Sequence, residues 1–159
     1  MKERVRFSAY SLIITVAIVV LCVAGAISLR GDTHRLILLC VILGTAIVMG
    51  LYYCPVSVEA GESGITLRRL ASRPRFFAYD DISFVDTCHP SAGGLRICGS
   101  GGAFGYWGYF SDIMIGTYFG YYGSRSHCFL IRLRNGRQYV IGCDGPVALT
   151  GFIRKHINA

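Results

Sequence analysis

Two groups of side chains have the type and spacing for chemistry at a membrane surface. The first is a basic cluster, Arg68, Arg69, Arg73 and Arg75. Each basic side chain near an anionic leaflet contributes about 1 kcal/mol, so this cluster predicts contact with anionic lipid headgroups. The second is an aromatic cluster, Tyr106, Trp107, Tyr109 and Phe110. Tyr and Trp are enriched where a membrane meets water, so this cluster is a candidate interface with lipid or with a protein partner.

Both clusters also have simpler interpretations. The arginines could form a solvated face that does no more than determine membrane topology. The aromatic residues belong to the block 99–123, which holds eight glycines and nine aromatics, and which could be a long hairpin or loop packed on its own domain. The block is not a nucleotide-binding fingerprint, because Phe104 occupies the third glycine position of G-x-G-x-x-G and no strand–helix unit surrounds it.

The sequence offers little for catalysis or metal binding. Cysteine and histidine are adjacent at Cys88–His89 and at His127–Cys128. Adjacent strand residues point to opposite faces, and structural zinc sites usually space their ligands two to four residues apart. The motifs G-x-S-x-G and H-E-x-x-H are absent from the sequence. We therefore expect no catalytic residues, no metal and no cofactor; an enzyme acting on a membrane substrate is the less favoured alternative.

The elements that position these residues begin with two uncharged runs, 7–29 and 36–53. As helices they would be about 34 Å and 27 Å long, enough to cross a hydrocarbon core of about 30 Å. The link 30–35 is short and polar, so the two transmembrane helices should be antiparallel neighbours. A signal peptide is the alternative, since residues 24–26 have the A-x-A form of a cleavage site, but the first run is longer than a usual h-region.

Charge and cysteine usage indicate the orientation. Sixteen Lys and Arg against nine Asp and Glu give a formal net charge of +7, and the mean hydropathy of +0.49 is too high for an ordinary soluble protein. The basic tail 1–6 and the arginines after the second run predict that both termini lie in the cytoplasm, although Arg30 and Arg35 in the link weaken this bias. Seven scattered cysteines fit reduced thiols better than a disulfide framework.

Residues 54–159 are expected to form a separate, mainly-β domain. Pro55 ends the second helix, since proline lacks the N–H that the helix needs. Asn135-Gly136 is a strong hairpin signal, and a helix with a basic last turn should follow Pro146. Alternating apolar residues between turn signals predict strands at 56–60, 65–70, 75–79, 82–86, 129–134 and 138–141.

Several stretches of this domain resemble the bacterial pleckstrin-homology-like (PH) domain families, in particular small membrane proteins with an N-terminal transmembrane hairpin. The stretches are GITLRRL (64–70), YDDISFVD (79–86), RICGSGGAFGYWGYF (96–110) and NGRQYVIGCDGP (135–146). The resemblance implies a barrel or split sandwich of two sheets capped by the C-terminal helix, and no established activity. The loop that binds inositol phosphates in eukaryotic PH domains corresponds to AGESG (60–64), which lacks Lys and Arg; that ligand is not expected.

We therefore predict two transmembrane helices followed by a PH-like domain in the bacterial cytoplasmic (inner) membrane. The expected function is that of a non-enzymatic, membrane-tethered interaction module. It would present the glycine/aromatic segment to a protein partner or to a second copy of the chain, and it would bind no nucleic acid. Binding of anionic lipid through the arginine cluster is the alternative.

Overall fold

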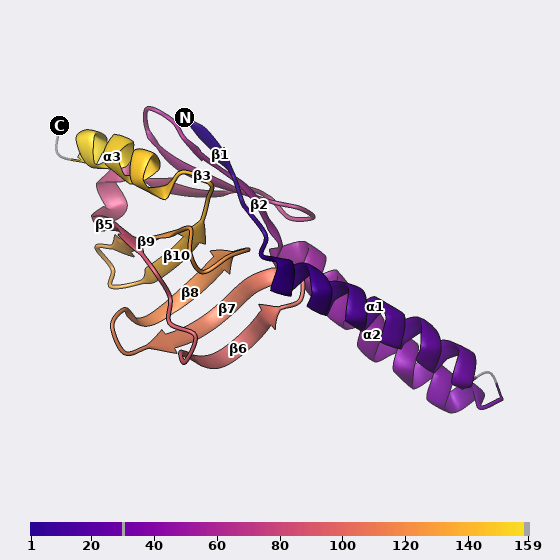
Figure 1. Cartoon of the computed structure of the whole chain (residues 1–159). Coiled ribbons are helices and arrows are strands. Elements are labelled where there is room, and N and C mark those ends of the chain that lie inside the picture. Colours follow the sequence, from indigo (N-terminus) through magenta and orange to yellow (C-terminus); the bar gives the residue numbers. More distant parts are fainter. Residues whose placement is uncertain (30, 158–159) are drawn as a thin grey trace.

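The computed structural model describes residues 1–29 and 31–157 (Figure 1). Two long helices, α1 (Ala9–Ser28) and α2 (Thr33–Tyr53), run side by side away from a domain of two β-sheets and a C-terminal helix. The end where α1 begins and α2 ends adjoins the domain and is called the base of the helix pair. The opposite end, which holds the short link between the helices, lies far from the domain.

The helix pair is apolar on every side, and the rest of the chain leaves that surface uncovered. Only 6 % of the most apolar window of each helix is buried, so neither is a core helix of this domain. Ser8 caps α1 by accepting the Ser11 amide at 3.2 Å, and Asp32 caps α2 by accepting the Arg35 amide at 3.2 Å. Both helices are long and apolar enough to cross a membrane.

The first sheet is antiparallel and is interrupted by the helix pair. Its strands, in spatial order, are β1 (Lys2–Arg4), β2 (Pro55–Ala60), β3 (Gly64–Arg69) and β4 (Arg75–Ala78). β1 precedes α1 in the chain and β2 follows α2, yet the two strands pair, with Lys2 opposite Glu59 and Arg4 opposite Ser57. The start of α1 and the end of α2 are therefore each connected to a strand of the same sheet.

The second sheet has the spatial order β5-β9-β10-β8-β7-β6, in which only β10 and β8 are parallel. A 3-10 turn at Tyr79–Asp81 leads into it. The strands are β5 (Ile82–Cys88), β6 (Leu95–Gly102), β7 (Gly105–Asp112), β8 (Gly116–Tyr122), β9 (Cys128–Leu133) and β10 (Gln138–Gly142). The glycine/aromatic block is thus a meander of three strands. Gly99 and Gly108 face each other with φ of +128° and +121°, and a Cβ on either would overlap the other strand's backbone.

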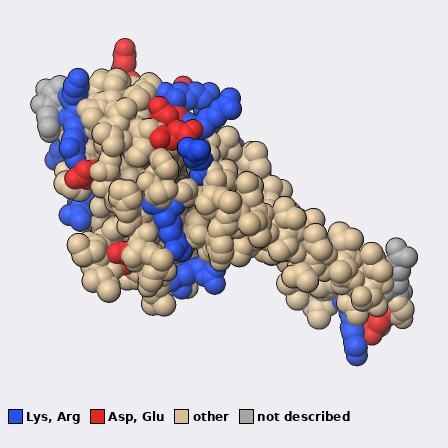
Figure 2. Space-filling view, in the orientation of Figure 1, with Lys and Arg blue, Asp and Glu red and all other residues tan. Residues whose placement is uncertain are grey.

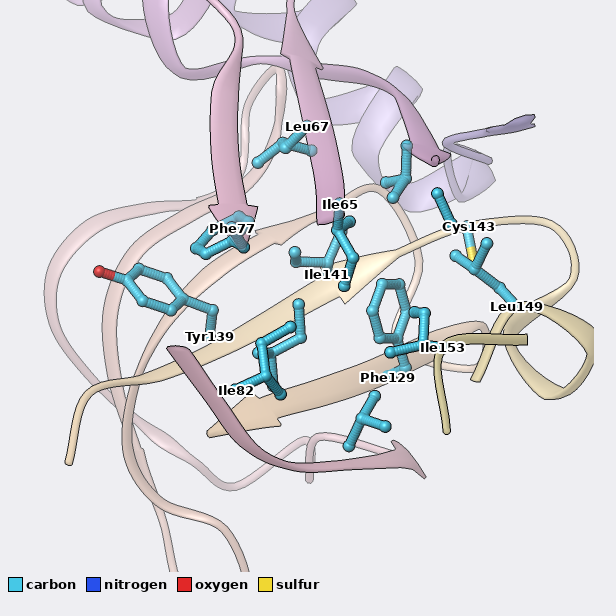
Figure 3. Close-up of a cluster of buried hydrophobic side chains, with 14 of the residues drawn as sticks. Ile65, Leu67, Phe77, Ile82, Phe129, Tyr139, Ile141, Cys143, Leu149 and Ile153 are labelled. Atoms are coloured by element: carbon cyan, nitrogen blue, oxygen red, sulfur yellow. The ribbon is translucent and has the colours of Figure 1, made fainter. Parts of the chain in front are cut away.

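The main core lies between the two sheets, and α3 (Pro146–Ile157) covers one end of it (Figure 3). Leu149 and Ile153 of α3 are fully buried, because they lie one helical turn apart on the same face. Strand side chains from both sheets meet them there, including Ile65, Leu67, Phe77, Ile82, Phe129 and Ile141. A second buried cluster lies on the other face of the second sheet: Tyr106, Phe110, Tyr118, Tyr122, Cys128, Leu130 and Val140.

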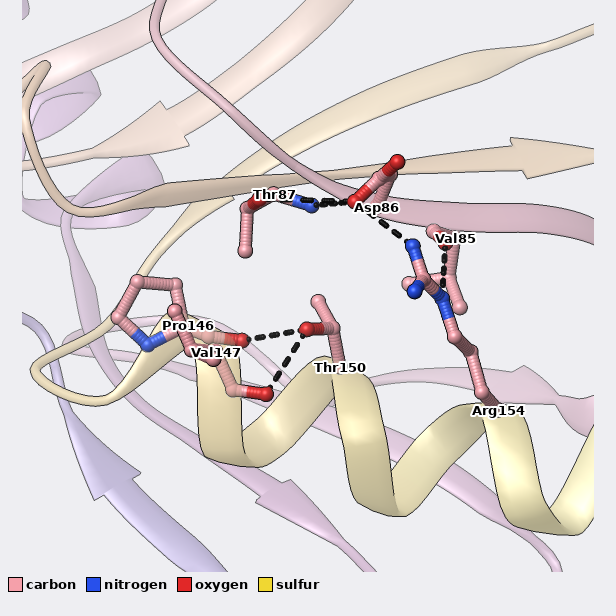
Figure 4. Close-up of polar contacts among 7 residues, drawn as sticks. All are labelled: Val85, Asp86, Thr87, Pro146, Val147, Thr150 and Arg154. Carbon is pink, nitrogen blue, oxygen red and sulfur yellow. Dashed lines mark hydrogen bonds and ion pairs between the residues drawn. The ribbon is translucent and has the colours of Figure 1, made fainter.

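Polar contacts fasten α3 to β5 (Figure 4). Arg154 Nη2 forms an ion pair with Asp86 Oδ1 at 2.7 Å, and its Nε donates to the Val85 carbonyl at 3.1 Å. Thr150 Oγ1 donates to the carbonyl of Pro146 at 2.8 Å, which occupies an acceptor in the first turn of the helix. The helix is therefore held both by its buried face and by one cation on its flank.

The structure confirms the main elements expected from the sequence and corrects others. The two apolar helices, the antiparallel strands, the β2–β3 and β9–β10 hairpins and the C-terminal helix are present. The two sheets remain separate over the described residues, so a barrel is not confirmed. Residues 1–6, expected as a tail, contain β1, and the helices begin at Ala9 and Thr33. Residue 30 of the predicted link 30–35 lies outside the described residues.

Candidate functional site

The turn between β6 and β7 is fixed to the first turns of α1 by two hydroxyl side chains. Ser11 Oγ donates to the Gly102 carbonyl at 2.5 Å and accepts from the Gly105 amide at 3.1 Å. One helical turn further along, Thr15 Oγ1 accepts from the Phe104 amide at 3.0 Å. These hydroxyls give partners to backbone groups that would otherwise be buried and unsatisfied.

Phe104, at the tip of this turn, rests on α2. Its φ of +54° lies in the left-handed region, which is uncommon for a residue with a side chain. A Cβ at Gly50 would overlap the Phe104 ring, so the missing side chain at Gly50 makes the seat for the ring. Ser11 and Thr15 are two and six residues into α1, so the turn reaches about 3–9 Å along the helix from its start.

The four residues of the predicted aromatic cluster do not form one surface. Trp107 stacks on Tyr53 at the end of α2, with ring centroids 5.0 Å apart and planes at 12°. Tyr106 and Phe110 are buried in the second cluster, and Tyr109 alone of the four is classed as exposed. This alternation follows from the period of two along β7. The aromatic block is therefore packed largely on its own domain and on α2.

Two of the four predicted arginines are engaged within the domain. Arg68 Nη2 pairs with Glu59 Oε2 at 3.1 Å across β2 and β3. Arg75 Nη2 donates to the Tyr139 hydroxyl at 2.5 Å and Nη1 to the Tyr121 hydroxyl at 3.4 Å. The Arg75 guanidinium also lies 4.5 Å from the Tyr139 ring centroid, which suits a cation–π contact.

The other two, Arg69 and Arg73, lie at the base of the helix pair. The turn between β3 and β4 is bonded to the end of α2, where Ser72 Oγ donates to the Tyr52 carbonyl at 2.9 Å. The Arg69 guanidinium lies 5.5 Å from the Tyr52 ring centroid, and its Nη2 donates to the Arg73 carbonyl at 2.7 Å. These two arginines, which lie about fifteen or more residues beyond α2 in the sequence, are thereby brought back to the end of that helix.

A second basic pair, Arg96 and Arg125, lies beside the start of α1. Both line a cavity of about 220 Å³ between β6, β7, β8 and the loop after β8. That loop is held at the base by the Ser8 amide, which donates to the Gly123 carbonyl at 2.9 Å. The Arg125 guanidinium lies 4.8 Å from the Tyr106 ring centroid, and its buried Nε has no acceptor. Neither arginine forms an ion pair with any described residue.

An apolar groove of about 290 Å³ adjoins this cavity. Its walls are formed by side chains of α1 and α2, by the β6–β7 turn and by Trp107, whose buried Nε1 has no acceptor among the described residues. Arg96 lines both the groove and the cavity. The two hollows are therefore neighbours that share Arg96.

The charges of the molecule are distributed in bands (Figure 2). Lys and Arg side chains lie on the domain, both beside the helices and at its opposite edge, the long surface of the helix pair is uncharged, and charges return at its far end. At that far end Arg35 pairs with Asp32 at 3.1 Å. An uncharged band between two charged ends matches the profile of a lipid bilayer.

Burial keeps the hydroxyls in the cavity neutral. The Tyr118 and Tyr122 hydroxyls are 3.4 Å apart, and burial raises the pKa of both above the ordinary value, so both remain donors. Burial alone would raise the pKa of nearby Asp112, but hydrogen bonds to its carboxylate, including those from the Ser91 and Met114 amides, lower it. The carboxylate is therefore ionised and already occupied by backbone donors.

The described cysteines form no metal cluster, and Cys88 and Cys143 are held as thiols. No group of three or more His, Cys, Asp or Glu lies close enough there to hold a metal ion. Burial, with Asp112 and Asp86 nearby, raises the pKa of Cys88 to about 12, and burial with Glu3 raises that of Cys143 to about 12. Both therefore remain thiols at neutral pH, and a thiol is a poor nucleophile.

Comparisons with known proteins do not extend this picture. Protein-family models, curated proteins and solved structures were all searched, and none matches the chain. The resemblance to PH-like domains therefore remains a prediction, and the function is argued from the geometry.

Four residues at the base were not predicted as site residues from the sequence: Ser11, Thr15, Arg96 and Arg125. Ser11 and Thr15 carry a signal in retrospect, because hydroxyls in an apolar run commonly face a polar partner. Arg96 and Arg125 stand alone in sequence, and only the folding of β6 and of the loop after β8 brings them together.

Proposed function

We propose that the protein is a membrane-anchored, non-enzymatic binding module whose domain rests on the membrane surface. The uncovered apolar surfaces of α1 and α2 support insertion, since surfaces of this kind are stable in lipid. The β6–β7 turn supports it as well: irregular backbone at membrane depth needs internal partners, and Ser11 and Thr15 supply them.

In this proposal both termini and the domain lie on the cytoplasmic side of a bacterial inner membrane. Lys2, Arg4 and Arg6 precede α1, and Arg69 and Arg73 follow α2, which is the excess that favours this side. The pairing of β1 with β2 supports retention of α1, because cleavage of a signal peptide would remove a strand from the first sheet.

The ligand that we propose for the module is the anionic headgroup region of the membrane. The observation that carries this choice is the position of basic side chains on both sides of the base. Arg69 and Arg73 lie at the end of α2, and Arg96 and Arg125 lie beside the start of α1. Cations near the membrane surface attract phosphate groups, at about 1 kcal/mol for each charge.

Lipid selectivity in reconstituted membranes tests this function. The full chain is placed in nanodiscs of zwitterionic lipid with a small fraction of spin-labelled phosphatidylglycerol or spin-labelled phosphatidylcholine. We expect the motionally restricted fraction to be larger for the anionic label, and the difference to shrink in high salt. Equal fractions for the two labels in low salt would overturn the proposal.

The variant pair for this test keeps the net charge equal. The double variant Arg69→Gln with Arg73→Gln removes two charges at the base. The double variant Arg134→Gln with Arg137→Gln removes two exposed charges in the β9–β10 turn. Only the first pair should lower the selectivity. An equal effect of both pairs would mean that net charge, and not the base, attracts the lipid.

A protein partner is the second candidate, because one apolar loop of the domain is uncovered. Ile113 and Met114, between β7 and β8, are 102 % and 90 % exposed, and Leu95 beside them on β6 is also exposed. Exposed apolar side chains that cluster in this way are typical of interaction sites. Ile113→Ser with Met114→Ser should abolish a specific crosslink formed from Tyr109 in native membranes; an unchanged crosslink pattern would contradict this candidate.

A further inference from the structure

We infer that β6 forms a specific site for one anionic phospholipid, with an acyl chain in the apolar groove and the phosphate on Arg96. The inference rests on the proposed function, since it requires the domain to lie at the membrane surface. It goes further because it assigns one lipid molecule to one binding site. A general attraction of lipid by the basic surface would not require such a site.

The apolar groove has the lining and the location that an acyl chain requires. Ile18 of α1 and Ala46 and Met49 of α2 form one wall, and Phe104 and Trp107 form the other. The lining helix residues belong to the two candidate spans, so insertion of both helices would place this wall of the groove within the hydrocarbon region. Apolar walls at that depth favour a lipid chain over a soluble ligand.

The polar end of the groove is formed by Arg96. Its guanidinium is seated over Gly101, where an added Cβ would lie 2.8 Å from Nη1. It has no acidic partner among the described residues, and it borders both hollows. Guanidinium groups form strong paired hydrogen bonds with phosphate oxygens.

The neighbouring cavity suits the remainder of a headgroup. Arg125 adds a second cation with an unpartnered Nε, and the hydroxyls of Tyr118 and Tyr122 add neutral donors. Asp112 is the acidic group nearby, and its oxygens accept from the Ser91 and Met114 amides. The cavity therefore presents a positive end at Arg96 and Arg125, where the lipid phosphate would be placed.

Quenching of Trp107 fluorescence tests this assignment directly. Trp107 is the only tryptophan in the chain, and it lines the groove. The full chain is reconstituted in zwitterionic vesicles with increasing fractions of phosphatidylglycerol or phosphatidylcholine, each brominated on the acyl chains. We expect half-quenching at a roughly tenfold lower fraction of the anionic lipid, since one charge-assisted hydrogen bond is sufficient for a preference of this size.

Three variants separate the parts of the site. Arg96→Gln should remove the preference, and Arg96→Lys should retain part of it, with near-ultraviolet circular dichroism confirming that both are folded. Ala46→Phe fills the groove and should lower quenching by both brominated lipids. As the control, Arg134→Gln removes an exposed arginine of the β9–β10 turn, which lines neither hollow, and should leave the preference unchanged.

The outcomes distinguish this inference from the proposed function. Equal quenching by the two lipids, or a preference that survives Arg96→Gln, overturns the specific site. If the preference survives Arg96→Gln but is lost with Arg69→Gln and Arg73→Gln, the proposed function stands and the site does not. If millimolar inorganic phosphate in the aqueous phase removes the preference, the site binds a free anion and the assignment to a lipid is wrong.

Discussion

Replacing Ser11 by alanine should release the β6–β7 turn from α1 and leave the domain folded. The change removes one hydroxyl and leaves the Gly105 amide and the Gly102 carbonyl, both buried, without a partner. Each such group costs about 1–3 kcal/mol, and water that enters the gap recovers part of this, so docking should weaken by about 2–4 kcal/mol. Since 1.4 kcal/mol corresponds to tenfold, the undocked population should rise roughly 30- to 800-fold.

Hydrogen exchange of the full chain in detergent, read by mass spectrometry, measures this population. Peptides that contain Phe104 and Gly105 should exchange faster by a factor in this range, because opening of the turn exposes their amides. Peptides from β9 and β10 should exchange as in the unaltered chain, since Ser11 does not contact them. Emission from Trp107 should also shift to the red as the turn leaves Tyr53.

The matched control is Thr45→Ala, which removes a hydroxyl from the neighbouring helix. Thr45 Oγ1 donates only to the Val41 carbonyl of its own helix, so its loss should leave the turn docked. Exchange at Gly105 that changes less than about threefold in Ser11→Ala would refute the reasoning, because the two hydrogen bonds would then contribute almost nothing to docking.

Three further predictions concern the domain. Ile153→Ala should lower the free energy of unfolding by about 2–5 kcal/mol in urea titrations of the full chain. Val147→Ala, on the exposed face of α3, should change it by less than about 0.5 kcal/mol. Similar values for both variants would contradict the placement of α3. Because the pKa of Cys88 and of Cys143 is raised to about 12 from 9.0, the unfolded chain loses these protons first, so stability should fall as pH rises from 9 towards 12. Urea titrations at about pH 8 and pH 10 check this, and a flat profile that Cys143→Ala does not alter would refute it. Arg154→Gln should cost only about 0.2–1 kcal/mol, with the loss smaller in high salt, because its pair with Asp86 is half exposed; a loss above about 2 kcal/mol would show that the pair is more important than its exposure indicates.

Local signals were sufficient to predict many elements of this fold, but not β1 or the strands β6, β7 and β8 of the glycine/aromatic block. The lengths of two uncharged runs identified α1 and α2, Asn135-Gly136 identified the β9–β10 hairpin, and Pro146 marked the start of α3. Each of these features is decided by residues close in sequence, and propensity and period describe such features well. The resemblance to PH-like domains adds an overall architecture that stays a prediction.

The candidate site could not be predicted in the same way, because contacts between distant residues build it. Ser11 and Gly105 are separated by 94 positions, and neither position indicates the other. Trp107 was a candidate interface residue, yet it stacks on Tyr53, because β7 begins beside α2 only after the second sheet has formed. The arginine cluster was predicted as one group, but the domain divides it into two engaged arginines and two at the base.

If the helix pair spans the membrane as proposed, the pairing of β1 with β2 makes correct folding depend on correct insertion. β1 leaves the ribosome before either helix, and its partner strand follows only after both helices have been made. The sheet closes only if the hairpin enters the bilayer as a unit, with both of its ends on one side. A chain that inserted a single helix would leave β1 across the membrane from β2, and the bare edge of β2 would be prone to aggregation. Topological errors in this protein would therefore become folding errors, which cellular quality control can recognise.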